Sequence, residues 1–254
     1  MATKRVIGVI TVMNNKAVQS FGYQNYLPLG CPKVLAENLD RWGADEILIL
    51  DISASKKDVG PNLQLLSSLQ GIYLSTPLIY GGGIRNKEEA KCVIQNGADR
   101  IVIETIANRD LAKVEKIAHE IGKQAIIRSI CIVEKEDKYY QYSYLDKSLK
   151  EIDLNILNGT NNSDIYSEVM LVDVMNEGEN GKFNSNLINI IDGKQKLIAY
   201  GGVGTGTTAI SQMAEQKICA IAIGNQLNYT EESIYMLKDM INNQPIRKSN
   251  IVLK

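Results

Sequence analysis

Eight short runs of apolar, largely β-branched residues recur along the 254 residues of this chain. They begin at residues 5, 46, 77, 100, 124, 168, 196 and 220, and read RVIGVITV, EILILDI, PLIY, RIVI, QAIIRSI, EVMLVDV, KLIAY and AIAI. Most of them are continuously apolar, which is typical of strands buried on both faces of a parallel sheet. A β-sandwich, whose strands alternate polar and apolar residues, is therefore disfavoured.

Segments with helical periodicity separate these runs. The clearest span residues 32–42, 86–97, 110–122, 206–216 and 230–241. In the second, Asn86 can cap the helix together with Glu89, and Gly97 suits its C-terminal end. Strands that alternate with helices predict βαβ units. Two segments break the rhythm and are predicted to be insertions: an exposed hairpin from Glu134, and a polar loop from Leu157.

The chain also repeats itself approximately. LILD ends at Asp51 and MLVD ends at Asp173, while PLIYGGGI places Gly82 against Gly202 of KLIAYGGVG, so that the offset is 120 to 122 residues. Two halves of four βα units, roughly residues 1–122 and 123–254, would close a single (β/α)8 TIM barrel domain over residues 1–254. A doubly wound open sheet is the alternative, and eight strands in two similar halves fit it less well.

Composition limits the partners of this barrel. Lys and Arg number 28 against 29 Asp and Glu, so no global field attracts nucleic acid or an anionic membrane. The four cysteines lie far apart and have no metal-binding spacing, so we expect neither a metal nor a cofactor. No apolar run approaches a membrane span and the N-terminus does not resemble a signal peptide, so we expect a cytoplasmic protein.

Glycine runs follow the third and seventh strands, at residues 81–83 and 201–204, and Gly224-Asn225 follows the eighth. Glycine lets the backbone approach an anion closely, and the N–H groups at the start of the next helix can hold a phosphate. The sequence therefore predicts a phosphorylated small molecule at the rim where the strands end. The alternative is that these glycines only make tight turns.

Two carboxylates, Asp51 and Asp173, end strands and are the candidates for general acid and base at this rim. Capping of nearby loop N–H groups is the alternative role for both. The single histidine, His119, lies in a helical pattern and is expected outside the barrel, which argues against a Ser-His-Asp arrangement.

Charged residues stand at the opposite end, where strands begin. Because strand N-termini converge around the barrel axis, two arginines and two glutamates there can form a ring of alternating charge: Arg5, Glu46, Arg100 and Glu168. Ordinary ion pairs on the stability face are the simpler interpretation.

Several segments carry a family resemblance. KRVIGVITV, GADEILILDISAS, PLIYGGGIRNKEEA, NGADRIVIETIANRD, LVDVMNEGENGKF and LIAYGGVGTG align in order, from about Lys4 to Asn228, and resemble the HisF-like cyclase subunit of imidazole glycerol phosphate synthase. The resemblance implies a half-barrel repeat, two phosphate sites at one rim, and a HisH-like glutaminase at the other end whose ammonia crosses the barrel.

The resemblance also implies roles for individual residues. Phosphate contacts would come from Gly82, Gly83, Thr105, Gly178, Gly202, Gly224 and Asn225. The ammonia gate would be the ring of Arg5, Glu46, Arg100 and Glu168, and the glutaminase interface would include Asp99.

Departures from the family pattern are concentrated at the rim. The two aspartates that act as acid and base in the family align with Thr11 and Ile130, which cannot exchange protons near neutral pH. A loop lysine of the family aligns with Gln19. Glu104 and Glu177 replace an asparagine and an aspartate near the phosphate sites, where an extra carboxylate disfavours a dianion.

A retained gate with lost rim chemistry resembles divergent HisF-like proteins that accompany a glutaminase and a PP-loop ATP-dependent amidotransferase in bacterial surface-sugar pathways, lipopolysaccharide biosynthesis among them. The leading hypothesis is therefore a barrel that relays ammonia for amidation of a sugar. One alternative is the cyclase, a lyase of histidine biosynthesis, with Asp51 and Asp173 replacing the lost pair. Another is a non-catalytic scaffold that binds a phosphorylated metabolite.

Overall fold

The computed structural model of the chain describes residues 3–152, 165–191, 195–230, 233–241 and 243–248. The polar loop predicted from Leu157 lies outside these residues. Within them, every predicted apolar run forms a strand, and every predicted helical segment contains a helix.

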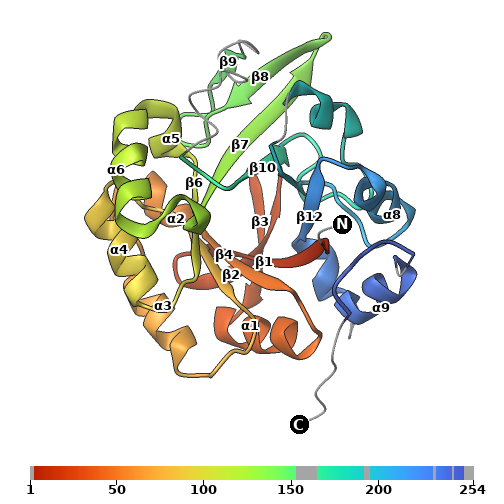
Figure 1. The fold of residues 1–254 in the computed structure, drawn as a ribbon, viewed down its shortest axis with the longest axis horizontal. Coiled ribbons are helices and arrows are strands. Elements are labelled where there is room, and N and C mark those ends of the chain that lie inside the picture. The colour runs from red at the N-terminus through yellow and green to blue at the C-terminus, as the bar shows by residue number, and fades with distance from the viewer. Residues whose placement is uncertain (1–2, 153–164, 192–194, 231–232, 242, 249–254) are drawn as a thin grey trace.

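Eight parallel strands form the barrel (Figure 1). Each pairs with the next, and the last pairs with the first, so the sheet closes. This confirms the (β/α)8 TIM barrel and excludes the open sheet. In order around the barrel, the strands are β1 (Arg5–Met13), β4 (Glu46–Asp51), β5 (Leu78–Gly81), β6 (Arg100–Ile103), β7 (Ile126–Lys135), β10 (Glu168–Asp173), β11 (Leu197–Tyr200) and β12 (Ile218–Ile223).

Helices surround the barrel on its outside (Figure 1). The predicted helices are α1 (Pro32–Arg41), α4 (Lys87–Gln95), α6 (Leu111–Ile121), α8 (Thr207–Ala214) and α9 (Ser233–Met240). Asn86 caps α4 by accepting the Glu89 N–H at 2.8 Å, as predicted. Three helices were not predicted, namely α2 (Ile52–Lys56), α3 (Leu63–Gln70) and α5 (Thr105–Arg109). The described part of the chain also contains the 3-10 segments η1 (Lys123–Ala125), η2 (Ser185–Ile190) and η3 (Asn225–Asn228).

Two antiparallel extensions stand on the rim where the barrel strands end. The predicted hairpin extends β7 through β8 (Lys138–Tyr142) and β9 (Leu149–Glu151), and in Figure 1 it projects beyond the barrel. A second hairpin, of β2 (Lys16–Phe21) and β3 (Asn25–Gly30), folds back along the end of β1 and was not predicted.

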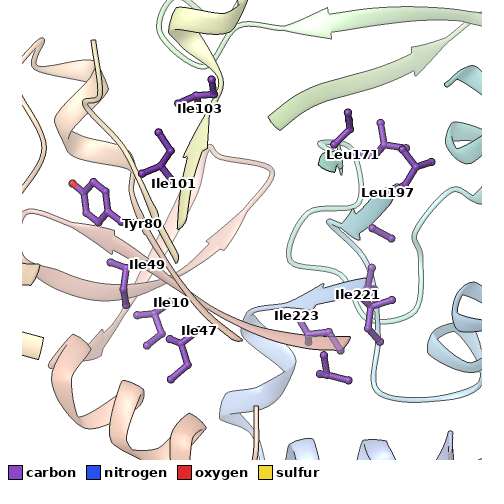
Figure 2. Packing of buried hydrophobic residues seen from close by; sticks show 14 of the residues in the cluster. Ile10, Ile47, Ile49, Tyr80, Ile101, Ile103, Leu171, Leu197, Ile221 and Ile223 are labelled. Atoms are coloured by element: carbon purple, nitrogen blue, oxygen red, sulfur yellow. The ribbon is translucent and has the colours of Figure 1, made fainter. Parts of the chain in front are cut away.

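Side chains alternate between two apolar clusters along the strands. The outer cluster packs against the helices and includes Ile10, Ile47, Ile49, Tyr80 and Ile101 (Figure 2). The inner cluster fills the barrel and draws on all eight strands: Ile7, Val9, Leu48, Ile79, Val102, Ile127, Met170, Val172, Ile198, Ala220 and Ala222 are among its members. Burying one such large aliphatic side chain contributes about 1.5–3 kcal/mol to the stability of the barrel.

Candidate functional site

The four charged residues at the strand N-termini form a closed ring. Arg5 Nη1 lies 2.9 Å from Glu46 Oε2, and Arg5 Nη2 lies 2.6 Å from Glu168 Oε1. Arg100 closes the other side, with Nη1 3.1 Å from Glu46 Oε1 and Nη2 2.7 Å from Glu168 Oε2. Each side chain is at most 16% exposed. The ring that the sequence predicted is therefore present, at the end of the inner apolar cluster where the barrel strands begin.

The two arginines of the ring favour the charged form of Glu168. Burial opposes ionisation of Glu168, but the charges of Arg100 and Arg5 outweigh it and lower the pKa of this carboxyl. The Cys219 thiol lies 3.4 Å from both Glu168 Oε1 and Arg5 Nη2. Burial raises the pKa of this thiol to about 12, so it enters the ring uncharged.

Asp99 lies at the same end of the barrel as the ring. Its Oδ2 accepts the N–H of Leu78 at 2.8 Å, at the start of β5. This contact fixes the aspartate on the face where the sequence predicts a protein partner. Its part in such an interface stays a prediction.

At the opposite end of the barrel, on the rim where the strands end, the carboxylates of Asp51 and Asp173 accept local hydrogen bonds. Asp51 Oδ1 accepts from the N–H groups of Ser53 and Ala54 at the start of α2, and Oδ2 accepts from Asn62 Nδ2 at 3.1 Å. Asp173 accepts from the Asn176 side chain at 2.8 Å and from the Asn184 N–H at 2.9 Å. Both sets of contacts fit the capping role, so catalysis by this pair stays an untested prediction.

The positions of the family's acid and base hold no carboxylate. Thr11 is buried, and its hydroxyl acts on the pKa of the nearby Tyr200 hydroxyl. Ile130, however, is a wrong match, because its side chain belongs to the outer cluster. Neighbouring residues of a strand face opposite ways, so the inward position is Cys131, which belongs to the inner cluster. Burial raises the pKa of the Cys131 thiol, so it too is protonated near neutral pH.

Part of the predicted phosphate set, namely Gly82, Gly83 and Thr105, lines one pocket, here called the first rim pocket. Gly82 has φ +126°, and a Cβ there would overlap the carbonyl of Asp51. A Cβ on Gly83 would lie 2.8 Å from the Gly60 carbonyl. Glycine is thus required by the packing of the turn, and Gly83 N–H donates to Ser55 Oγ at 3.1 Å.

The rest of the predicted set, Gly178, Gly202, Gly224 and Asn225, lines a second rim pocket. The amide of Asn225 is engaged with β2, because Nδ2 donates to the Ser20 carbonyl at 2.7 Å and Oδ1 accepts the Ser20 N–H at 3.2 Å. Phosphate binding at both pockets stays a prediction.

The contacts of the rim glycines show which residues of the two half-barrels correspond. A Cβ on Gly201 would overlap the carbonyl of Asp173, just as one on Gly82 would overlap that of Asp51. Gly201 is therefore the counterpart of Gly82, one residue before the Gly202 that the sequence alignment chose.

Two glutamates accompany these pockets, Glu104 half-buried and Glu177 buried. Burial raises the pKa of Glu104, which lines the first, and of Glu177, which lines the second. Glu177 Oε2 accepts from Ser20 Oγ at 3.0 Å and from the Tyr23 N–H at 3.2 Å. Glu177 thus holds the β2–β3 hairpin down on the rim, together with Asn225.

Sequence reasoning missed a group of tyrosines at this rim. Tyr23, on the hairpin turn, contacts Tyr144 edge to face with ring centroids 5.9 Å apart, and both Tyr23 and Tyr200 are buried at this rim. Tyr144 donates to the Ile52 carbonyl at 2.9 Å. Neither Tyr23 nor Tyr144 lies in an apolar run, and only the density of tyrosines in the two hairpins could have indicated them. Gln19 is buried on β2, and His119 is exposed on α6, outside the barrel as predicted.

No helix within the described ranges is long and apolar enough to cross a membrane.

Comparison with known proteins agrees with this geometry. The family model described as histidine biosynthesis protein matches residues 5–233. A Vibrio vulnificus protein, provisionally named imidazole glycerol phosphate synthase subunit hisF2, is 28% identical over 244 residues, which cover 94% of this chain and 88% of that protein. The imidazole glycerol phosphate synthase subunit HisF of Exiguobacterium is 25% identical over 255 residues, or 97% of each chain. That of Sulfolobus acidocaldarius is 27% identical over 210 residues, covering 80% and 82%. Because the family model spans the whole closed barrel, the chain belongs to the histidine biosynthesis protein family, as a divergent HisF-like member.

Proposed function

We propose that this chain is the barrel subunit of a glutamine amidotransferase system. It accepts ammonia from a HisH-like glutaminase at the face that carries the ion ring, and passes it along the barrel axis. The recipient is a separate PP-loop amidotransferase that amidates a sugar of a bacterial surface polysaccharide. The observation that carries the proposal is the closed ring of Arg5, Glu46, Arg100 and Glu168 at one end of an apolar barrel.

The chemistry of the barrel suits neutral ammonia. The inner cluster between the ring and the rim is largely aliphatic, and a bare ammonium ion would lose its hydration there without a counter-charge. Each arginine bridges both glutamates, so displacement of one arginine opens the ring while the other keeps the two carboxylates paired. Such a ring can open without leaving either carboxylate unpaired.

The residues at the rim favour delivery of ammonia to another enzyme over the cyclase reaction of the family. Thr11 and Cys131 occupy the inward positions where the family carries its acid and base, and both are uncharged near neutral pH. Asp51 and Asp173 are already committed to capping. The proposal therefore assigns the amidation chemistry to a second protein.

A glutaminase assay with the purified HisH-like partner tests this function. We expect the barrel to bind the partner and to stimulate glutamine hydrolysis. A barrel that neither binds nor stimulates the partner contradicts the proposal, and phosphometabolite binding without any effect on a glutaminase would favour the scaffold.

The cyclase of histidine biosynthesis remains the second candidate, favoured by the names of the relatives and by the two glycine-lined rim pockets. It predicts that this chain rescues a histidine auxotroph that lacks the cyclase subunit. We expect no growth. Growth would show that residues outside the family's usual positions supply the general acid and base. Asp51 and Asp173 would then be the first residues to mutate.

A further inference from the structure

The first rim pocket opens into the interior of the barrel. Its lining includes Val102 and Met170, which are inward-facing members of the inner cluster, and Leu50, which packs against that cluster. Its walls also carry the Cys131 thiol and the Ser129 hydroxyl. A small molecule that travels along the barrel axis would therefore emerge into this pocket.

The polar lining of this pocket suits a cation. Among the described residues that line it there is no lysine, arginine or histidine, whereas Asp51 and Glu104 are both present. Both Asp51 oxygens already accept hydrogen bonds from α2 and Asn62. Glu104 accepts from Thr105 Oγ1 at 3.0 Å and Asn108 Nδ2 at 2.7 Å, each a neutral donor.

Glu104 forms no ion pair within 4.0 Å among the described residues, although two arginines act on it from farther away. The charges of Arg109, on α5, and more weakly of Arg128, on β7, oppose the rise in the pKa of Glu104. Arg128 stacks instead on the Tyr166 ring, 5.7 Å from its centroid. The rings of Tyr23 and Tyr144 also line the pocket, and aromatic faces attract cations.

We propose that the first rim pocket is a binding site for ammonium or another small primary ammonium group, with the Glu104 carboxylate as its counter-ion. The inference deepens the proposed function and rests on it for the source of the nitrogen. Binding itself needs only the pocket. Glu104 stands where the family resemblance places an asparagine. Its negative charge disfavours a phosphate dianion in the pocket, but the same charge favours a bound ammonium group.

The pH dependence of this site follows from Glu104. Burial, the largest effect, raises its pKa, while Thr105, Arg109, Asn108 and Arg128 oppose the rise. Of the other titratable groups in the pocket, the Cys131 thiol is protonated near neutral pH. Ammonium binding requires the ionised carboxylate, so it should weaken as the pH falls through a pKa above the ordinary 4.5.

The probe is methylammonium chloride, titrated into the full-length chain alone at pH 7.5 against sodium chloride of equal ionic strength. We expect saturable NMR shifts of the Gly82, Gly83 and Thr105 amides. Glu104→Gln should weaken methylammonium binding by at least about tenfold, because a charge-assisted hydrogen bond is lost. Glu115→Gln, which removes the same charge from the exposed face of α6, should leave binding unchanged.

A second measurement uses the unmodified chain, so that its result does not depend on whether the Glu104→Gln variant folds correctly. Methylammonium affinity should fall as the pH is lowered from 7.5 to 5. The inference is overturned if methylammonium gives no saturable shifts, if Glu104→Gln binds it as well as the parent, or if only inorganic phosphate shifts these amides. No glutaminase is present, so a negative result here leaves the glutaminase assay as an independent test of the proposed function.

Discussion

At the scale of the residue, strand alternation decides what a position can do. Arg5, Glu46, Arg100 and Glu168 were predictable as a ring because each begins a strand, and strand beginnings converge. Ile130 was mismatched because an alignment offset by one residue turns an inward position outward. The sequence placed Asp51 and Asp173 at the ends of strands, but it could not decide between a catalytic and a capping role for them. The N–H groups that donate to these carboxylates belong to loops whose path depends on the whole rim.

The Gly82 turn gives a prediction at this scale. Gly82→Ala should lower the free energy of unfolding by at least about 2 kcal/mol, because a Cβ meets the Asp51 carbonyl and φ is +126°. Gly122→Ala is the matched control, with φ +82° and open space around the added atom, so it should cost only about 1 kcal/mol. Urea unfolding measures both. Equal losses in the two variants would show that packing against Asp51 contributes nothing.

At the scale of the element, continuous apolar runs and helical periodicity were sufficient for the eight strands and five of the helices. The β2–β3 hairpin was missed because tertiary contacts hold it, through Asn225 and Glu177 on other elements. The unit after β10 carries the short η2 where a full helix would be usual, and no periodic pattern marks it.

The Glu177 carboxyl under this hairpin links stability to pH. Its pKa in the folded chain is raised by burial, so its contribution is fully present at low pH and is lost as the pH rises through that pKa. Glu177→Gln cannot ionise, so the unfolding free energy of this variant should rise relative to that of the parent between pH 4 and pH 8.

Urea unfolding across this pH range, with Glu179→Gln as control, tests the link. Glu179 lines the same pocket but is exposed, so its variant should follow the parent curve. Parallel pH curves for Glu177→Gln and the parent would mean that Glu177 ionises as readily in the folded chain as in the unfolded one.

At the scale of the whole molecule, the two ends of the barrel have different chemistry. One end is a ring of four charged groups, and the other carries glycine turns, tyrosines and buried carboxyl groups around two pockets. The aliphatic interior separates them. The barrel and its two ends were predictable from sequence, but the contact between Tyr23 and Tyr144 at the rim was not, because it joins residues from separate hairpins.

The transfer of nitrogen from glutamine to product tests the relay most directly. The barrel is combined with the proposed HisH-like glutaminase and the proposed PP-loop amidotransferase, and the mixture is supplied with amide-15N glutamine, a candidate sugar substrate and an excess of unlabelled ammonium. A relay through the barrel predicts that the amidated product keeps the 15N label, and that Arg5→Ala, which breaks the ring, dilutes it. A product diluted to the isotopic composition of the solution with the unmodified barrel would contradict the account.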